Sequence, residues 1–368
     1  MMEYDKNRID SIHKPYGLEW REVYDMSEFL VGTYGRDERQ GIWKFSMDAE
    51  RNTFTQPEKA DAANKSSYLC RYGDLVYALS ETPGSGMLHA FRLKDGKLEL
   101  INRVGGVEPI LAHLSVSRDG KHIFRISYGT GHIGVTAVGP DGALERGEGR
   151  ILHEGRGPFP GRQTQSHGHS ITPTPDGKHV IACDLGTDEV LCLDMDPESG
   201  EIRENPEMSL RLPGGTGPRQ QAWHPAEDCV YVVTEMGYMI ATLGWDAERG
   251  LCLLDCREIR PELPKIDREG AAVKVSPDGR FVYTSCRWDG SLDIFRIGAD
   301  RIPSRVGTVS SGVEQPRDFL ITRDGRHLLA AGQRSGNIRI FQRDIETGGL
   351  EPAGSVEGFE QPVCLLEI

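Results

Sequence analysis

Residues 166–185 read SHGHSITPTPDGKHVIACDL, and this stretch decides how the rest of the chain is interpreted. It joins a short apolar run, a Pro-Asp-Gly turn signal and a second apolar run, which together predict a β-hairpin. The pattern recurs along the chain, although the first and fourth copies are degenerate. The turns of the copies lie at residues 71–74, 118–121, 175–178, 225–228, 277–280 and 323–326.

The spacing of these turns predicts a repeat fold. Successive turns are roughly 46 to 57 residues apart, which is the length of one blade of a propeller. Each copy continues into a third apolar run, such as Ser291–Arg296 or Asn337–Phe341, and then into a weaker fourth run. About four strands per repeat is the composition of a propeller blade. By length alone, 368 residues could form two domains or one repeat array, and the repeats favour the array.

The first and last repeats predict how the ring closes. Phe29–Tyr34 matches the second strand of the pattern with no first strand before it, and Gln361–Leu366 matches a lone first strand. We expect the C-terminal strand to complete the N-terminal blade, which would remove an exposed sheet edge. The sequence therefore predicts an all-β fold, a seven-bladed propeller of four-stranded blades over residues 26–368, after an N-terminal extension at residues 1–25.

Composition narrows the class of protein. The formal net charge of −13 argues against nucleic acid or an anionic membrane as the partner. No apolar run reaches the roughly 18 residues of a membrane span, and residues 1–10 are charged rather than signal-like. The eight cysteines form no Cys-x-x-Cys pair, which fits buried reduced thiols better than a zinc site. We expect a cytoplasmic protein, a monomer or weak homo-oligomer.

The repeat alignment also predicts a site. The first strand of each blade lines the central channel and the second runs back beside it, so the start of one and the end of the other share a mouth. At the start of the first strand, the equivalent position in five repeats holds His169, Arg219, Arg317, Ala112 or Ala271. The next position holds His113, Ser170, Gln220, Ala272 and Asp318. The second strands end at Tyr34, Glu81, Tyr128, Leu185, Glu235, Arg287 and Gln333.

Charged groups that converge on a channel mouth suggest a binding site, although such groups could also simply pair with one another. Arginines bind carboxylate or phosphate bidentately and can stabilise an oxyanion. A histidine or glutamate can take a proton from water, which typically contributes about 10²- to 10⁴-fold in rate. Opening of an ester or lactone on an anionic substrate fits these groups, and so does simple anion binding. Neither a metal nor another cofactor is needed.

An ordered set of motifs supports a more specific hypothesis. The set consists of Ala112–Ser117, Gln163–Ser170, Cys183–Asp188, Gly217–Arg219, Thr234-Glu235, Val275–Arg280, Pro316–Phe319 and Gln361–Cys364. With these motifs, the chain from about Glu28 to the end resembles the seven-bladed propeller lactonases, which include propeller-type 6-phosphogluconolactonases. One departure is Trp288, which is bulkier than the small residue usual at that position.

The resemblance implies hydrolysis of 6-phospho-D-glucono-1,5-lactone to 6-phosphogluconate, a step of the pentose phosphate pathway. The fold family also includes a carboxy-muconate lactonizing enzyme, whose proposed site has a histidine, two arginines and a glutamate. By motif, these correspond to the predicted catalytic residues His169, Arg219, Arg287 and Glu235. The predicted substrate-binding residues are His113, Arg317, Tyr128, Glu81 and Gln333.

In this interpretation, Arg219, Arg287 and Arg317 hold the anionic groups of a small lactone and the developing oxyanion, and Arg162 or Arg317 supplies charge for a phosphate. Either His169 or Glu235 activates water. Two alternatives stay open at this point. One is a lactonizing isomerase that moves a proton to or from carbon, and the other is a non-catalytic scaffold that binds a protein partner.

Overall fold

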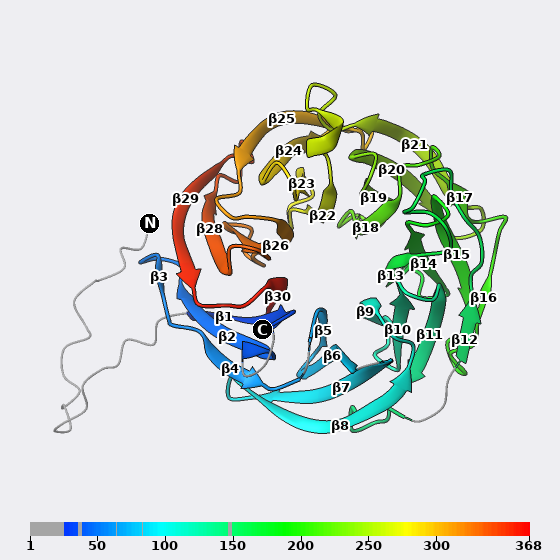
Figure 1. Cartoon of the computed structure of the whole chain (residues 1–368), viewed down its shortest axis with the longest axis horizontal. Helices are drawn as coiled ribbons and strands as arrows, with labels where there is room; N and C mark the ends of the chain where they lie inside the picture. The colour runs from blue at the N-terminus through cyan, green and yellow to red at the C-terminus, as the bar shows by residue number, and fades with distance from the viewer. Residues whose placement is uncertain (1–25, 36–38, 64, 83, 146–148) are drawn as a thin grey trace, which may run out of the picture.

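The computed structural model describes residues 26–35, 39–63, 65–82, 84–145 and 149–368, apart from the side chains of residues 81 and 82. Thirty strands in this part of the chain form seven antiparallel sheets, which are arranged as blades around a central opening (Figure 1). The predicted all-β propeller is confirmed. The predicted extension at residues 1–25 lies outside the described residues.

The first strand of each blade lies innermost, and later strands follow outward (Figure 1). Blade 1 contains β30 (Pro362–Glu367), β1 (Met26–Thr33), β2 (Ile42–Asp48), β3 (Thr53–Phe54) and β4 (Glu58–Asp61). Blade 2 contains β5 (Leu69–Tyr72), β6 (Leu75–Thr82), β7 (Ser85–Lys94) and β8 (Lys97–Val107). Blade 3 contains β9 (Leu111–Val116), β10 (His122–Ser127), β11 (His132–Ala137) and β12 (Gly149–Leu152). Blade 4 contains β13 (Gly168–Pro173), β14 (His179–Asp184), β15 (Glu189–Met195), β16 (Ile202–Glu204) and β17 (Leu210–Arg211).

The remaining three blades have four strands each. Blade 5 contains β18 (Pro218–Trp223), β19 (Cys229–Thr234), β20 (Met239–Asp246) and β21 (Gly250–Glu258). A single 3₁₀ turn, η2 (Lys265–Asp267), precedes blade 6. Blade 6 contains β22 (Gly270–Val275), β23 (Phe281–Cys286), β24 (Ser291–Ile297) and β25 (Pro303–Ser310). Blade 7 contains β26 (Pro316–Ile321), β27 (His327–Gly332), β28 (Asn337–Arg343) and β29 (Leu350–Glu357).

The repeated turn has the same chemistry in each clear copy. In blade 4, the Thr174 hydroxyl donates to the Asp176 carboxylate at 2.6 Å, and the Lys178 N–H donates to the same carboxylate at 3.0 Å. Gly177 has a φ of +67°, a conformation that a side chain disfavours. The equivalent hydroxyl-to-carboxylate bonds join Ser117 to Asp119, Ser276 to Asp278 and Thr322 to Asp324. The turn signal therefore reflects a specific hydrogen-bond pattern that places strand two beside strand one.

Ring closure follows the predicted arrangement. β1 pairs antiparallel with β30, from Phe29 opposite Glu367 to Thr33 opposite Pro362, and the two strands lie side by side in Figure 1. Apolar clusters fill the space between neighbouring blades, and one of them packs Phe29 and Leu365 of blade 1 against Leu329 of blade 7. Closure therefore removes a sheet edge and buries apolar surface at once.

The closing strand should contribute measurably to stability. Leu365 is only 6% exposed, so we expect Leu365→Ala to leave a cavity and lower the free energy of unfolding by about 2–5 kcal/mol. The matched change Leu254→Ala, on outer strand β21 where Leu254 is 46% exposed, should cost less than about 0.5 kcal/mol. Urea unfolding of both variants measures the difference. Equal shifts of the two midpoints would contradict a structural role for the closing strand.

Candidate active site

A repeated backbone irregularity brings the predicted side chains to one mouth of the channel. In blade 4, Gly168 pairs with Asp184 and Ser170 pairs with Cys183, so His169 is an extra residue in a β-bulge. Arg219 and Arg317 occupy the same bulge in blades 5 and 7. Because a bulge takes a residue out of the ladder and re-aims its side chain, these three groups project to the same level of the channel.

His169 and Arg317 line a cavity of about 170 Å³ at this mouth. Blades 5, 6 and 7 and one long connection contribute its charged side chains, blade 4 contributes His169, and blade 3 adds an apolar wall. The lining residues are Tyr34, Ile110, Leu111, Ala112, Tyr128, Arg162, His169, Glu235, Glu269, Arg287 and Arg317.

Glu235 is the centre of the charged network. It follows β19 and is 3% exposed. One of its oxygens accepts from Arg219 Nε at 2.9 Å and lies 2.8 Å from Arg287 Nη2, and its other oxygen accepts from Arg162. Burial alone would raise the pKa of Glu235, but the three guanidiniums outweigh burial and lower the pKa to about 2. The carboxylate is therefore ionised at neutral pH and is a poor proton acceptor.

A second carboxylate, Glu269, was not predicted from the sequence. It precedes β22 and lies 2.7 Å from Arg287 Nη2 and 3.9 Å from Arg162 Nη1. In the repeat alignment it stands two residues before Ala271, where His167 stands relative to His169. A search of that position in every repeat would have found it.

Arg162 lies in the connection between β12 and β13, which the repeat pattern does not cover. The side chain of the adjacent Gln163 fixes this connection, because it accepts from the Phe159 N–H at 2.9 Å and donates to the Leu185 carbonyl at 2.8 Å. The connection thereby places Arg162 against Glu235.

His169 is a neutral imidazole at neutral pH. It is 9% exposed, and the Tyr128 ring meets it edge-on at a centroid distance of 5.8 Å. Burial and the nearby charges of Arg219, Arg317 and Arg287 lower the pKa of His169 well below its usual range. The ring can therefore accept a proton from a bound molecule without first losing one.

Arg317 differs from the other arginines of the cavity. Its guanidinium lies 5.4 Å from the centre of the Tyr34 ring and donates to the Tyr34 hydroxyl at 3.5 Å. Within the described part of the chain it forms no ion pair. The cavity and its immediate surroundings thus bring together four arginines and only two glutamates, which favours an anionic ligand.

The structure brings together most of the predicted site. His169, Glu235, Arg287, Arg317 and Tyr128 line the cavity, and the buried Arg219 contacts it through Glu235. Two of the predicted residues, His113 and Gln333, are not among the residues that line the cavity.

The expectation that His113 lies at this mouth is corrected. Ala112 occupies the bulge of blade 3, so His113 returns to the ladder opposite Ile126 and lines the hollow at the other end of the channel. There its ring packs on the Tyr68 ring, with the two ring centroids 4.0 Å apart. Gln333 follows β27 and is not among the residues that line the cavity. The side chain of Glu81 lies outside those described.

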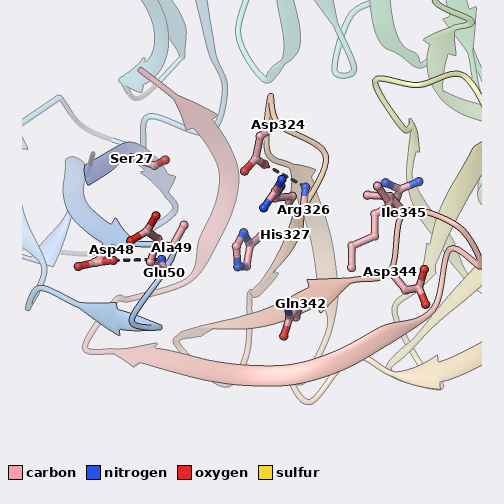
Figure 2. A pocket seen from close by; sticks show the side chains of 11 residues that line it. Ser27, Asp48, Ala49, Glu50, Asp324, Arg326, His327, Gln342, Asp344 and Ile345 are labelled. Atoms are coloured by element: carbon pink, nitrogen blue, oxygen red, sulfur yellow. Dashed lines mark hydrogen bonds between the residues drawn. The ribbon is translucent and has the colours of Figure 1, made fainter. Parts of the chain in front are cut away.

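A larger hollow of about 1,090 Å³ lies at the seam between blades 7 and 1, and Figure 2 shows its side chains. Its carboxylates serve local turns. Asp48 accepts the N–H groups of Glu50 and Arg51, both at 3.0 Å, and Asp324 accepts the Arg326 N–H at 2.9 Å. This hollow therefore lacks a convergent reactive cluster among the described residues, in contrast to the cavity around Glu235.

In the ranges that the structure describes, no group of three or more His, Cys, Asp or Glu side chains is arranged to hold a metal ion. Within the same ranges, no helix has both the length and the apolar character needed to cross a membrane.

The fold and the site together define a class. The family described as "Lactonase, 7-bladed beta-propeller" matches residues 28–367, and the chain belongs to this family. Among the relatives of known name, a Bacillus subtilis 6-phosphogluconolactonase is 29% identical over 350 residues, covering 91% of this chain and 96% of its own.

Solved structures agree with this assignment. A candidate 6-phosphogluconolactonase from Bacteroides fragilis superposes with a TM-score of 0.85 at 28% identity, covering 93% of this chain and 98% of its own. The periplasmic gluconolactonase of Pseudomonas aeruginosa has a TM-score of 0.86 at 25% identity, covering 93% of this chain and 99% of its own. The chain is therefore an enzyme of the lactonase class.

The ion pairs of Glu235 predict a specific acid dependence of stability. A carboxyl pKa of about 2 in the folded state, below its unfolded value, stabilises the fold above about pH 4.5, and this contribution is lost as the pH falls to 2. A shift of this size corresponds to roughly 3 kcal/mol. Between pH 5 and pH 2, the free energy of unfolding should therefore fall by about 3 kcal/mol more in the wild-type protein than in Glu235→Gln, as measured by urea unfolding. The variant Glu351→Gln, at an exposed position, serves as control. If the free energy of unfolding of Glu235→Gln falls with pH as steeply as that of wild type, the ion-pair account is refuted.

Proposed function

We propose that this protein hydrolyses 6-phospho-D-glucono-1,5-lactone to 6-phosphogluconate, or opens a closely related anionic sugar lactone. The observation that carries the proposal is the excess of guanidinium over carboxylate groups around a cavity with a neutral imidazole. The names of the Bacillus subtilis and Pseudomonas aeruginosa relatives support lactone substrates.

The proposed mechanism uses only groups of the chain and water. His169 accepts a proton from water as the water oxygen attacks the lactone carbonyl carbon. The carbonyl oxygen becomes an oxyanion, and the Arg287 guanidinium, with Arg219 behind it, stabilises that charge. The tetrahedral intermediate then collapses. The ring C–O bond breaks, and the leaving alkoxide takes the proton from His169 to give the hydroxy acid.

Glu235 and Glu269 act in this proposal as positioning residues. Like-charged guanidiniums repel one another, and the two carboxylates offset that repulsion so that the arginines can face a common point. Both oxygens of Glu235 are engaged by guanidiniums, whereas the neutral imidazole of His169 lines the cavity, which favours His169 as the base. Arg317, which lacks an ion-pair partner among the described residues, is the proposed anchor for the anionic group of the substrate.

The first test is hydrolysis of freshly made 6-phosphogluconolactone, coupled to 6-phosphogluconate dehydrogenase and compared with the spontaneous rate. Arg317→Ala should raise KM for this lactone about 10-fold or more while leaving the fold intact, because no buried carboxylate loses its partner. The exposed Arg249→Ala should change neither KM nor kcat. A wild-type rate equal to background would sink the proposal and direct attention to proton transfer at carbon on a muconate-type acid.

The depressed pKa of His169 predicts an unusual pH profile. Because the base loses its function only when it is protonated, kcat/KM should stay flat from pH 8 down to about pH 5.5, where an ordinary histidine would already be mostly protonated. His169→Gln should lower kcat about 10²- to 10⁴-fold at every pH in this range. An acid limb centred near pH 6.5 in the wild-type kcat/KM profile would contradict the role of His169.

A further inference from the structure

A second hollow adjoins the candidate active site. The side chain of Arg287, which forms part of the 170 Å³ cavity, also lines a groove of about 500 Å³ between blades 6 and 7. The 170 Å³ cavity is smaller than the roughly 300–1,000 Å³ typical of ligand pockets. A substrate larger than one sugar ring must therefore extend beyond it, and the groove on the other side of Arg287 is next to it.

The groove has an exposed aromatic wall. Trp288, the residue after Arg287, is 52% exposed, and the guanidinium of Arg334 lies 6.0 Å from the centre of its indole ring. About half of the Trp288 side chain is thus open to contact with a ligand beside the candidate catalytic groups.

The walls of the groove are fixed by backbone hydrogen bonds. The turn between β27 and β28 is joined to the segment that precedes β26, because the Arg334 N–H donates to the Glu314 carbonyl at 3.2 Å and the Glu314 N–H donates to Ser335 Oγ at 3.0 Å. Gly312, which has a φ of +67°, lies in that segment. The aromatic wall and the charged wall therefore face a preformed space.

The charges of the groove differ from those of the cavity. Arg334 and Glu314 are both exposed, and within the described part of the chain neither forms an ion pair. The other two charged groups of the groove are already paired: Arg287 with Glu235 and Glu269, and Asp289 with Arg260, from which it accepts at 2.5 Å. The charges of Arg334 and Glu314 are equal and opposite. The groove therefore offers the donors of one guanidinium and one carboxylate acceptor, without a preference for anions.

An indole face flanked by a donor and an acceptor is the complement of a hydroxylated ring. The C–H face of a sugar packs on the indole, and its hydroxyls bond to the guanidinium and the carboxylate. We propose that the groove walled by Trp288, Arg334 and Glu314 is a subsite for a second sugar ring or polyol unit attached to the lactone. The inference rests on the proposed lactonase function and extends its substrate class to glycosylated aldonolactones.

The test compares a two-ring lactone, cellobiono-1,5-lactone, with glucono-1,5-lactone by proton release above the spontaneous rate. Wild-type protein should show a kcat/KM for the two-ring lactone about 10-fold higher than for the single ring. Trp288→Ala should remove that advantage and change the single-ring value less than about 2-fold, whereas Trp288→Phe should keep most of it. Leu254→Ala, exposed on outer strand β21, serves as the control.

The outcomes separate the two proposals. Equal kcat/KM values for the two lactones in wild type, or an equal effect of Trp288→Ala on both, would overturn the subsite while leaving the lactonase function standing. If wild-type protein hydrolyses neither of these neutral lactones, the 6-phosphogluconolactone assay still decides on the lactonase function, and calorimetry with the product acids decides on the groove. Tighter binding of cellobionate than of gluconate, lost in Trp288→Ala, supports the subsite, and equal binding overturns it.

Discussion

The pairing of β1 with β30 is the constraint on which the rest of the molecule depends. Each blade buries both faces against its neighbours, so the sheets reach their final positions only when the ring is closed. Closure holds the inner strands at fixed heights around the channel. Bulges at the same register then deliver His169, Arg219 and Arg317 from three different blades to one level. The site is therefore a property of the ring and not of any single blade.

Electrostatics explains why this site holds together. Four guanidiniums so close to one another would repel strongly, and burial adds to the cost of each charge. Glu235 contacts three of them and Glu269 two, so the two carboxylates act as a shared counter-charge. Burial, together with this positive field, lowers the pKa of His169 and keeps the imidazole neutral. The two carboxylates neutralise only part of the positive charge of the four arginines, and an anionic substrate would neutralise more of it.

The fold could be predicted from the sequence because its turn chemistry is local. A hydroxyl, an aspartate and a glycine at fixed spacing mark each hairpin, and their period reveals the blades. Much of the site could be predicted for the same reason, since alignment on the turn also aligns the bulged residue. The position of His113 could not be predicted, because a bulge is a feature of pairing that the pattern of residues does not show. Arg162 comes from a connection outside the repeat, and its approach to Glu235 depends on tertiary packing.

The excess positive charge of the cavity has a consequence for turnover. Hydrolysis of a lactone converts a neutral ester into a carboxylate, so the product carries one more negative charge than the substrate. A cavity lined by three arginines and two glutamates, with a fourth arginine behind Glu235, would hold such a product more tightly than the lactone. An enzyme of this design is subject to product inhibition that weakens as ionic strength rises. As product accumulates, the bound acid competes with fresh lactone for the cavity and slows turnover.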